Sequence, residues 1–209
     1  MGDPKKHRKK YSNPVTPWNK ERIEVEKELV REYQLKNKKE IYKAHSLLRK
    51  YFSQSKKLIT SRTKQGEIEK EQLLNKLTSL GLLKPGSQLS NVLSISINDL
   101  LERRLQTIVF RKKLSKSMKQ ARQFITHYHI IVSGKKITSP SYLVSKKEED
   151  MITFSQSSKL SDSNHVERII KEISPEKAAE NAKKAKAYDK SGKDKRSRRR
   201  KVVIRKKRK

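Results

Sequence analysis

Residues 98–154 read NDLLERRLQTIVFRKKLSKSMKQARQFITHYHIIVSGKKITSPSYLVSKKEEDMITF, and this stretch decides the fold. Its first half repeats apolar residues at helical spacing, which predicts a helix carrying a broad apolar face from Leu100 to Val109 and a second helix over 117–127. Its second half contains short β-branched runs, which predict strands at 130–132, 137–138, 142–144 and 151–154. We therefore expect a small module of two helices followed by a sheet.

The boundaries of these helices are marked by local signals. Ser96 and Asp99 have the spacing of a capping box, and Ser117 and Gln120 have the same spacing before the second helix. The residues Ser133-Gly134-Lys135-Lys136 predict a hairpin turn in which Gly134 takes a positive φ. The polar run at 146–150 predicts a further turn. These helix caps and turns therefore mark residues 98–154 as one structural unit.

The second helix separates a core face from a polar face. At about 100° per residue, one side carries the apolar residues, and another side carries Lys119, Arg122 and Thr126 with Gln123 next to them. In the first helix, Arg103, Arg104 and Gln106 are expected to lie off the apolar face. The buried side is predicted to hold Met118, Ala121, Phe124 and Ile125.

The residues before this module predict a helical subdomain with a connection at 19–97. Helical stripes cover 19–34 and 40–60, and a third runs from Ile68 to Leu80. Gly81 is suited to end that third helix because it accepts a positive φ. Residues 84–87 predict a turn, and the alternation over 89–97 predicts an extended connection.

The two ends of the chain are strongly basic. Residues 1–18 contain Pro4, Pro14 and Pro17, which predict an extended arm whose exit from the fold is fixed by Trp18. Residues 155–189 predict a loop followed by weak helices. Residues 190–209 form a tail with thirteen Lys or Arg against one acid.

Charge and composition restrict the function. The chain has 209 residues and a formal net charge of +32, with 32% hydrophobic residues and no cysteine. Cysteine-liganded metal sites and disulfides are thereby excluded. We expect no membrane span, signal peptide, metal or cofactor, because no sufficiently long apolar run or ligand constellation is present. No nucleotide-binding loop or catalytic constellation occurs, so an enzyme is not expected.

An anionic partner is expected to balance this charge, and nucleic acid is favoured over a membrane surface or an acidic protein. The tails lack the apolar face that a membrane helix would need. RNA is preferred to DNA because no DNA-binding motif is present and a rigid basic surface suits folded RNA. The candidate RNA-binding residues are Lys5, Lys6, Arg8, Lys9, Lys10, Arg103, Arg104, Lys119, Gln120, Arg122, Gln123, His127, Lys135 and Lys136.

The residues LLERRLQTIVFRKKL and QARQFITHYHIIVSGKKITSPSYLV resemble the RNA-binding domain of the small-subunit ribosomal protein S4 family. The opening MGDPKKHRKKY followed by PW resembles its archaeal and eukaryotic-cytosolic branch, most closely the archaeal type. The resemblance covers roughly residues 1–155. It implies an α+β fold in which a helical subdomain precedes an S4-type domain with basic extended tails.

The resemblance also implies a structural constituent of the small ribosomal subunit, located on cytoplasmic ribosomes. Such proteins bind a multi-helix junction in the 5′ domain of the ribosomal RNA, act early in subunit assembly and affect decoding accuracy. Neighbours of the S3 and S5 families and messenger RNA at its path into the subunit are implied. The family's RNA contacts carry over most directly to Arg103, Arg104, Gln120, Arg122, Gln123, His127 and Lys135.

The sequence departs from the family pattern at two turns. Glycine is usual between the two histidines and in the joint before the second helix, where this chain has Tyr128 and Lys113. Ser133 also stands where the family often has Asn or Gly. Because side chains disfavour positive φ, the geometry of these turns is left open by the sequence.

Two other functional readings use the same module. A free-standing RNA-binding ribosome factor would lack the N-terminal subdomain and the PW arm. An RNA-modification accessory protein or enzyme would need a separate catalytic domain, which neither flank offers. DNA compaction is suggested only by the tails.

Overall fold

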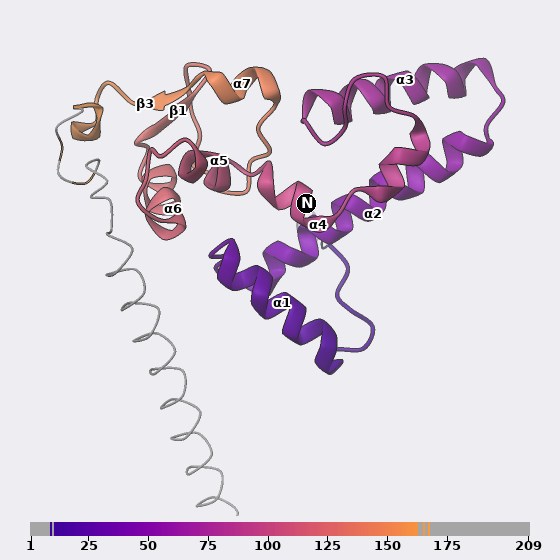
Figure 1. The fold of residues 1–209 in the computed structure, drawn as a ribbon, viewed down its shortest axis with the longest axis horizontal. Helices are drawn as coiled ribbons and strands as arrows, with labels where there is room; N and C mark the ends of the chain where they lie inside the picture. Colours follow the sequence, from indigo (N-terminus) through magenta and orange to yellow (C-terminus); the bar gives the residue numbers. More distant parts are fainter. Residues whose placement is uncertain (1–8, 10, 163–164, 166, 168–209) are drawn as a thin grey trace, which may run out of the picture. The chain divides into compact units, whose positions relative to one another are not determined.

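The computed structural model describes residues 9, 11–162, 165 and 167. It shows an α+β fold, as predicted, in which helices precede a small antiparallel sheet and pack on one of its faces (Figure 1). The expected weak helices after residue 167, the tail 190–209 and arm residues 1–8 and 10 lie outside the described residues. The elements are α1 (Lys20–Glu32), α2 (Lys38–Thr60), α3 (Lys64–Ser79), η1 (Leu89–Ser94), α4 (Ile97–Glu102), α5 (Leu105–Arg111), α6 (Met118–Thr126), β1 (Ile130–Val132), β2 (Lys135–Lys136), α7 (Lys146–Asp150), β3 (Ile152–Phe154) and η2 (Lys159–Ser161).

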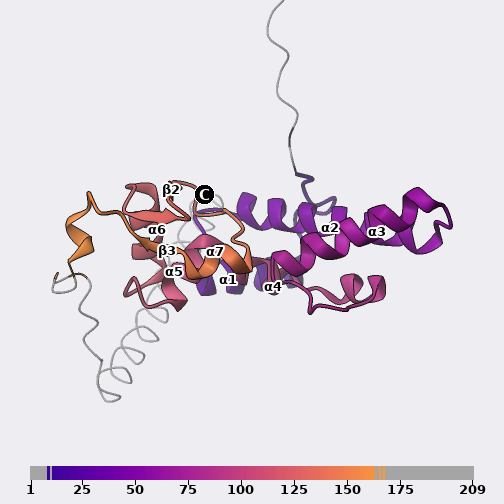
Figure 2. The same ribbon diagram turned by 90° about the horizontal axis from the view of Figure 1, so that it is seen from above.

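Helices α1 and α3 begin at residues suited to the N-cap position. The Asn19 side chain accepts a hydrogen bond from the Arg22 amide at the start of α1, and Thr63 accepts one from the Gly66 amide at the start of α3. Each bond satisfies an amide that has no partner inside the helix. Gly81 follows α3 with a φ of 73°, as predicted. Helix α3 packs beside α2 (Figures 1 and 2).

The connection after α3 is helical, so the prediction of an extended segment over 89–97 is wrong. Leu89 and Val92 lie three residues apart on the buried side of the 3-10 helix η1, whereas Leu93 is exposed. The Ser55 hydroxyl of α2 donates to the Leu89 carbonyl at 2.9 Å. Packing against α2 thus outweighs the local alternation of apolar residues.

The N-terminal arm is attached differently from the prediction. The side chain of Trp18 is 89% exposed, so it does not fix the arm to the fold. Instead, the Ser12 amide donates to the Ser46 hydroxyl of α2 at 3.1 Å. Arg49 of the same helix approaches the Ser12 hydroxyl at 3.5 Å.

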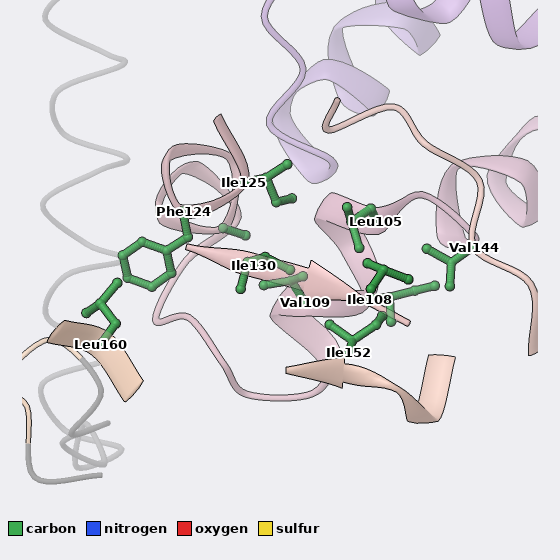
Figure 3. Packing of buried hydrophobic residues seen from close by; sticks show 11 residues of the cluster. Leu105, Ile108, Val109, Phe124, Ile125, Ile130, Val144, Ile152 and Leu160 are labelled. Atoms are coloured by element: carbon green, nitrogen blue, oxygen red, sulfur yellow. The ribbon is translucent and has the colours of Figure 1, made fainter. Parts of the chain in front are cut away.

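The sheet has the strand order β2-β1-β3, with both pairings antiparallel. In register, Val132 faces Lys135 across one pairing and Ile152 across the other. Helices α5 and α6 pack on the face that carries Ile130, Val132 and Ile152 (Figure 3). Leu160 of η2 also joins this core, so packing on the module continues beyond residue 154.

Three local predictions in this region need correction. The hairpin turn consists of Ser133 and Gly134 alone, both with positive φ, because Lys135 and Lys136 are already paired in β2. Residues 137–138 form no strand, and 142–144 contribute only the isolated bridge Arg104–Leu143. Residues 146–150 form helix α7 in place of the predicted turn, because Ser145 and Glu148 make a capping box.

Candidate nucleic-acid interface

The chain bends between α4 and α5 at Arg103 and Arg104. The Ser96–Asp99 capping box that was predicted opens α4, but the helix ends at Glu102. At the bend, the segment 142–144 supplies the backbone hydrogen-bond partners: the Leu105 amide donates to the Tyr142 carbonyl at 2.8 Å, and the Val144 amide donates to the Arg103 carbonyl at 3.0 Å. The bend changes the direction of every following side chain, so these directions cannot be predicted from residue spacing in one uninterrupted helix.

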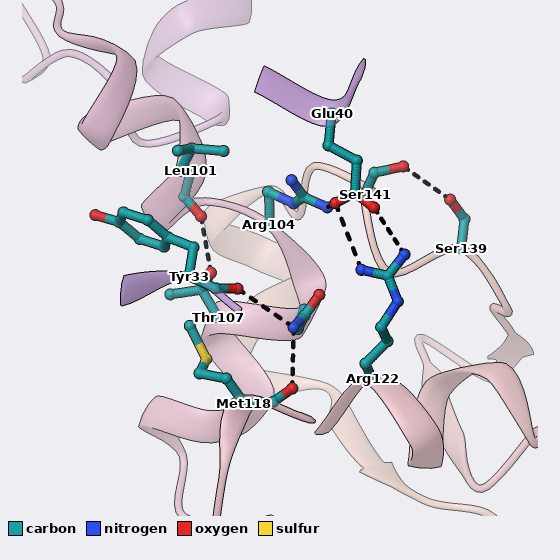
Figure 4. Close-up of polar contacts among 10 residues, drawn as sticks. Tyr33, Glu40, Leu101, Arg104, Thr107, Met118, Arg122, Ser139 and Ser141 are labelled. Carbon is teal, nitrogen blue, oxygen red and sulfur yellow. Dashed lines mark hydrogen bonds and ion pairs between the residues drawn. The ribbon is translucent and has the colours of Figure 1, made fainter. Parts of the chain in front are cut away.

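Arg104 is consequently buried, with 4% of its surface exposed, rather than on a free polar face. Its guanidinium donates to Glu40 at 2.6 Å, and Arg122 of α6 donates to the other carboxylate oxygen of Glu40 at 2.7 Å (Figure 4). Burial alone would raise the pKa of Glu40, but the hydrogen bonds from Arg122 and Arg104 outweigh burial and lower the pKa. Glu40 of α2 therefore ties Arg104 and Arg122 of the module to the helical subdomain.

Gln106 is also buried, against the prediction that it lies off the core face. Its side-chain amide donates to the Met118 carbonyl at 2.9 Å (Figure 4). Its Oε1 atom has no hydrogen-bond partner within the described residues. The neighbouring Thr107 hydroxyl donates to the Leu101 carbonyl at 2.8 Å. Gln106 thus joins α5 to the start of α6.

Arg103 also makes contacts within the chain. It donates to Glu149 of α7 at 2.7 Å and to the Val144 carbonyl at 3.0 Å. Only 15% of its side chain is exposed. Arg103 thereby fixes α7 against the bend between α4 and α5.

Exposed polar residues form a stripe along α6. Lys119, Gln123 and His127 are four residues apart, so they lie one above another on the helix, and all three are exposed. Met118, Ala121, Phe124 and Ile125 form the buried side, as predicted.

Gln120 caps α6 in a different way from the predicted box. The Ser117 hydroxyl accepts from the Gln120 amide, as expected. The Gln120 side chain, however, accepts from the Lys116 amide at 2.7 Å. Gln120 is half-buried and fixes the entry of the chain into α6.

A hollow of about 500 Å³ lies beside the end of this stripe and is lined by Gln123, His127, Tyr128 and Lys136. The His127 and His129 rings have centroids 6.4 Å apart, and His129 Nδ1 lies 2.8 Å from the Ser158 hydroxyl. Tyr128 is 58% exposed. The lining also includes Lys159 and one acid, Glu167. The hollow therefore presents two ammonium groups and a carboxylate together with an amide and aromatic rings. We call the stripe with this hollow the α6 surface.

The two lysines of β2 lie on opposite sides of the strand, because successive strand residues alternate. Lys136 lines the hollow. Lys135 is close enough to Glu148 to contribute to the lowered pKa of that carboxyl, although the largest cause is the backbone hydrogen bond from Ser145. Only Lys136 of the pair therefore belongs to the α6 surface.

The remaining predicted site residues belong to the arm. Lys9 is exposed, whereas Lys5, Lys6, Arg8 and Lys10 lie outside the described residues. Glu40 and Tyr128 were not predicted as site residues. Tyr128 was detectable as an aromatic residue where glycine is usual, but nothing local marks Glu40 as the partner of two arginines.

Over the described residues, no group of three His, Asp or Glu side chains is placed to hold a metal ion. None of the helices there is long and apolar enough to cross a membrane.

Comparison with known proteins gives a consistent result. Residues 103–152 match the S4 domain family. The chain is 50% identical over 169 residues to the small ribosomal subunit protein uS4 of Methanococcus maripaludis, an alignment covering 80% of this chain and 95% of the relative. It is also 50% identical over 169 residues to the protein of the same name from Methanococcus aeolicus, covering 80% and 96%.

Proposed function

This chain belongs to the uS4 family of small ribosomal subunit proteins and is of archaeal type, and from this premise we propose that it binds small-subunit ribosomal RNA directly through the α6 surface. Its general role, as a structural protein of the small ribosomal subunit, follows from its membership of this family. We assign it no catalytic activity.

The observation that carries the proposal is the α6 surface, where Lys119 and Lys136 flank exposed Gln123, His127 and Tyr128. Lysines that neutralise phosphates release counterions, which supplies affinity without sequence preference. Amides and aromatic rings can bond and stack with unpaired bases, which RNA offers in its loops and junctions. The combination suits a folded RNA better than a uniform duplex.

Arg103, Arg104 and Arg122 have a supporting role in this proposal. Their guanidinium groups bond to Glu149 and Glu40 within the chain, so they hold α7, α2 and α6 in place behind the contact surface. Arg122 keeps 25% of its side chain exposed and is the one of the three that we also propose to reach RNA.

The specific partners that we propose are those that the family resemblance implies. We propose that the RNA target is the 5′-domain junction and that binding there acts early in subunit assembly and in decoding accuracy. Proteins of the S3 and S5 families and incoming messenger RNA are the proposed neighbours. The basic arm, including Lys5, Lys6, Arg8, Lys9 and Lys10, is proposed to contact the same RNA.

The proposal is tested first by crosslinking RNA to this protein in cells. We expect small-subunit ribosomal RNA to dominate the crosslinked RNA and the protein to sediment with the small subunit. A protein that crosslinks mainly to other RNAs and sediments free of ribosomes would instead support the alternative, a free-standing RNA-binding factor.

A binding experiment tests the surface itself. We expect Lys119→Ala with Lys136→Ala to weaken binding to a 5′-domain RNA fragment by about tenfold or more, since two phosphate contacts are lost. Lys70→Ala with Lys76→Ala removes the same charge from the exposed side of α3 and is the matched control. Within β2, Lys135→Ala should matter less than Lys136→Ala. Equal losses in all variants would show that only total charge counts.

A further inference from the structure

A second concave site lies where α2, α4, α6 and the loop at 140–143 meet. It is a cavity of about 380 Å³, within the size range of sites that hold small ligands. Its lining includes four cationic side chains and one carboxylate, namely Lys39, Lys43, Arg104, Arg122 and Glu40. We call it the Glu40 cavity.

The rest of the lining is mostly apolar. It includes Ala44 and Leu47 of α2, Leu100 of α4 and Leu143. A site that contains both apolar and cationic groups suits a ligand that has a flat ring and an anionic group. Inorganic phosphate would leave the apolar residues uncovered, and a purely apolar ligand would leave Lys39 and Lys43 without an anionic partner.

The cations of the cavity differ in their freedom to bind an anion. Arg104 is buried and bonded to Glu40, and Arg122 is bonded to the same carboxylate (Figure 4). Lys39 and Lys43 are exposed on the first turns of α2, four residues apart on one side of the helix. Because Glu40 repels an anion, the favourable place for a phosphate is the rim formed by these lysines and the exposed part of Arg122.

The position of the cavity indicates the source of the ligand. Arg122 lies three residues after Lys119 on α6, so the cavity opens beside the α6 surface rather than on a remote part of the molecule. RNA that runs along the α6 surface would pass this opening.

We propose that the Glu40 cavity receives one unstacked nucleotide of the bound RNA, with its base against Ala44, Leu47 and Leu143 and its phosphate near Lys39, Lys43 and Arg122. This inference rests on the proposed function, and it adds a second contact that reads an unpaired base. Proteins recognise single-stranded RNA in this way, by enclosing splayed bases.

The test places a photo-crosslinking residue, benzoylphenylalanine, at Ser141 of the full-length protein, because Ser141 is exposed and lines the cavity. Bound to the 5′-domain RNA fragment, it is expected to crosslink to one unpaired nucleotide. Ala44→Leu fills the cavity without changing charge and should lower the crosslink yield by about tenfold or more. Crosslinks spread over paired helices, or a yield unaffected by Ala44→Leu, would overturn the proposal.

Lys39→Ala with Lys43→Ala provides a second variant if Ala44→Leu does not fold, because both lysines are exposed. It should also reduce the crosslink, whereas Lys50→Ala with Lys56→Ala, on the same helix, should leave it unchanged. Equal effects of the two double variants would contradict a local site. RNA binding that responds to Lys119→Ala with Lys136→Ala but gives no Ser141 crosslink would refute the cavity alone, whereas no RNA binding at all refutes both proposals.

Adenosine monophosphate serves as the probe for a free nucleotide. Added to the RNA-free protein, it should shift the amide signals of residues 39–47 and 141–143 only at millimolar concentration, since one nucleotide lacks the support of the surrounding RNA. Micromolar binding that also blocks the Ser141 crosslink would assign the cavity to a free nucleotide and overturn RNA as the source.

Discussion

Four residues other than glycine in the described part of the chain have the left-handed backbone conformation, with φ of 47° at Gln34, 56° at Lys113, 64° at Tyr128 and 48° at Ser133. A residue with a Cβ is disfavoured there by about 1 kcal/mol or more. Lys113 and Tyr128 stand in the two turns that flank α6, so both turns keep the geometry that glycine would provide. Tyr128 is exposed in the hollow, where an aromatic ring offers a stacking surface that glycine lacks.

Replacing Lys113 or Tyr128 by glycine should therefore have different effects on the stability of the protein and on its binding to RNA. We expect Lys113→Gly to raise the free energy of unfolding by up to about 1 kcal/mol, and Tyr128→Gly to do the same while weakening RNA binding. Urea titration followed by circular dichroism measures the first effect. Lys119→Gly inside α6 is the control and should destabilise the protein by about 1 kcal/mol. Destabilisation by both turn variants would contradict the strain argument.

Glu40 is the other residue with consequences beyond its surroundings. Its lowered pKa means that its contribution to stability is fully present above the unfolded-state value near 4.5 and is lost as pH falls through the folded-state pKa. We expect thermal stability to fall on acidification below about pH 4.5, and this acid loss to be smaller in Glu40→Gln. Melting curves between pH 3 and 7 would show the difference. An unchanged acid profile in Glu40→Gln would exclude this carboxyl as a source.

At neutral pH the same carboxylate balances a buried guanidinium. Glu40→Ala leaves Arg104, with 5% of its side chain exposed, without its partner. Breaking such a pair typically costs about 3–5 kcal/mol, so the variant should melt far earlier than wild type. Glu71→Ala, on the exposed part of α3, should leave the melting curve nearly unchanged. Comparable melting of both variants would show that the ion pairs of Glu40 do not hold the module against the helical subdomain.

At the scale of the elements, short helices depend on their caps. Helix α4 has only six residues, and its first turn is closed by the reciprocal bonds of Ser96 and Asp99, with Ser96 N to Asp99 at 2.8 Å. Helix α7 has five residues and the same arrangement at Ser145 and Glu148. Neither segment is long enough to be helical without capping and packing.

Removing a cap should thus have a measurable cost. Ser96→Ala is expected to lower the free energy of unfolding by about 1 kcal/mol, because an amide at the start of α4 loses its partner. Ser53→Ala in the middle of α2 exchanges the same atoms at an exposed position and should be neutral or slightly stabilising. Chemical denaturation compares them, and equal effects would remove the special role of the capping box.

At the scale of the whole molecule, the positive charge is divided between the folded part of the chain and its two ends. Residues 190–209 carry thirteen Lys or Arg and one Asp, more than a third of the net charge of +32. Such a segment is expected to neutralise the phosphates of an RNA of any sequence, whereas the contacts proposed for the α6 surface and the Glu40 cavity depend on the shape of the RNA. We therefore expect the tail to contribute mainly to affinity, and the α6 surface and the cavity to contribute mainly to selectivity.

Deleting 190–209 should weaken binding to the 5′-domain RNA and to a scrambled RNA of equal length by similar factors, with a shallower salt dependence. Lys119→Ala with Lys136→Ala should instead reduce the preference for the 5′-domain RNA. Filter binding at several salt concentrations measures both quantities. Loss of the preference on tail deletion, with the preference kept in the lysine variant, would reverse these roles.

The sequence by itself determined the α+β class, the helical subdomain, the buried side of α6 and the caps at Ser96 and Ser117. These follow from periodicity and from hydrogen bonds that close within a few residues. It also indicated an anionic partner, with RNA favoured, because net charge is a property of composition.

Only the tertiary structure decided which cations remain available. Arg104 and Arg122 meet Glu40 from a distant part of the chain, and Gln106 enters the core because the backbone bends at Arg103. The 3-10 helix at 89–94 likewise depends on packing against α2. The spacing of residues along the sequence predicts which face of a single helix is buried, but it does not predict how two distant segments pack against each other. The partners of buried charges depend on this packing.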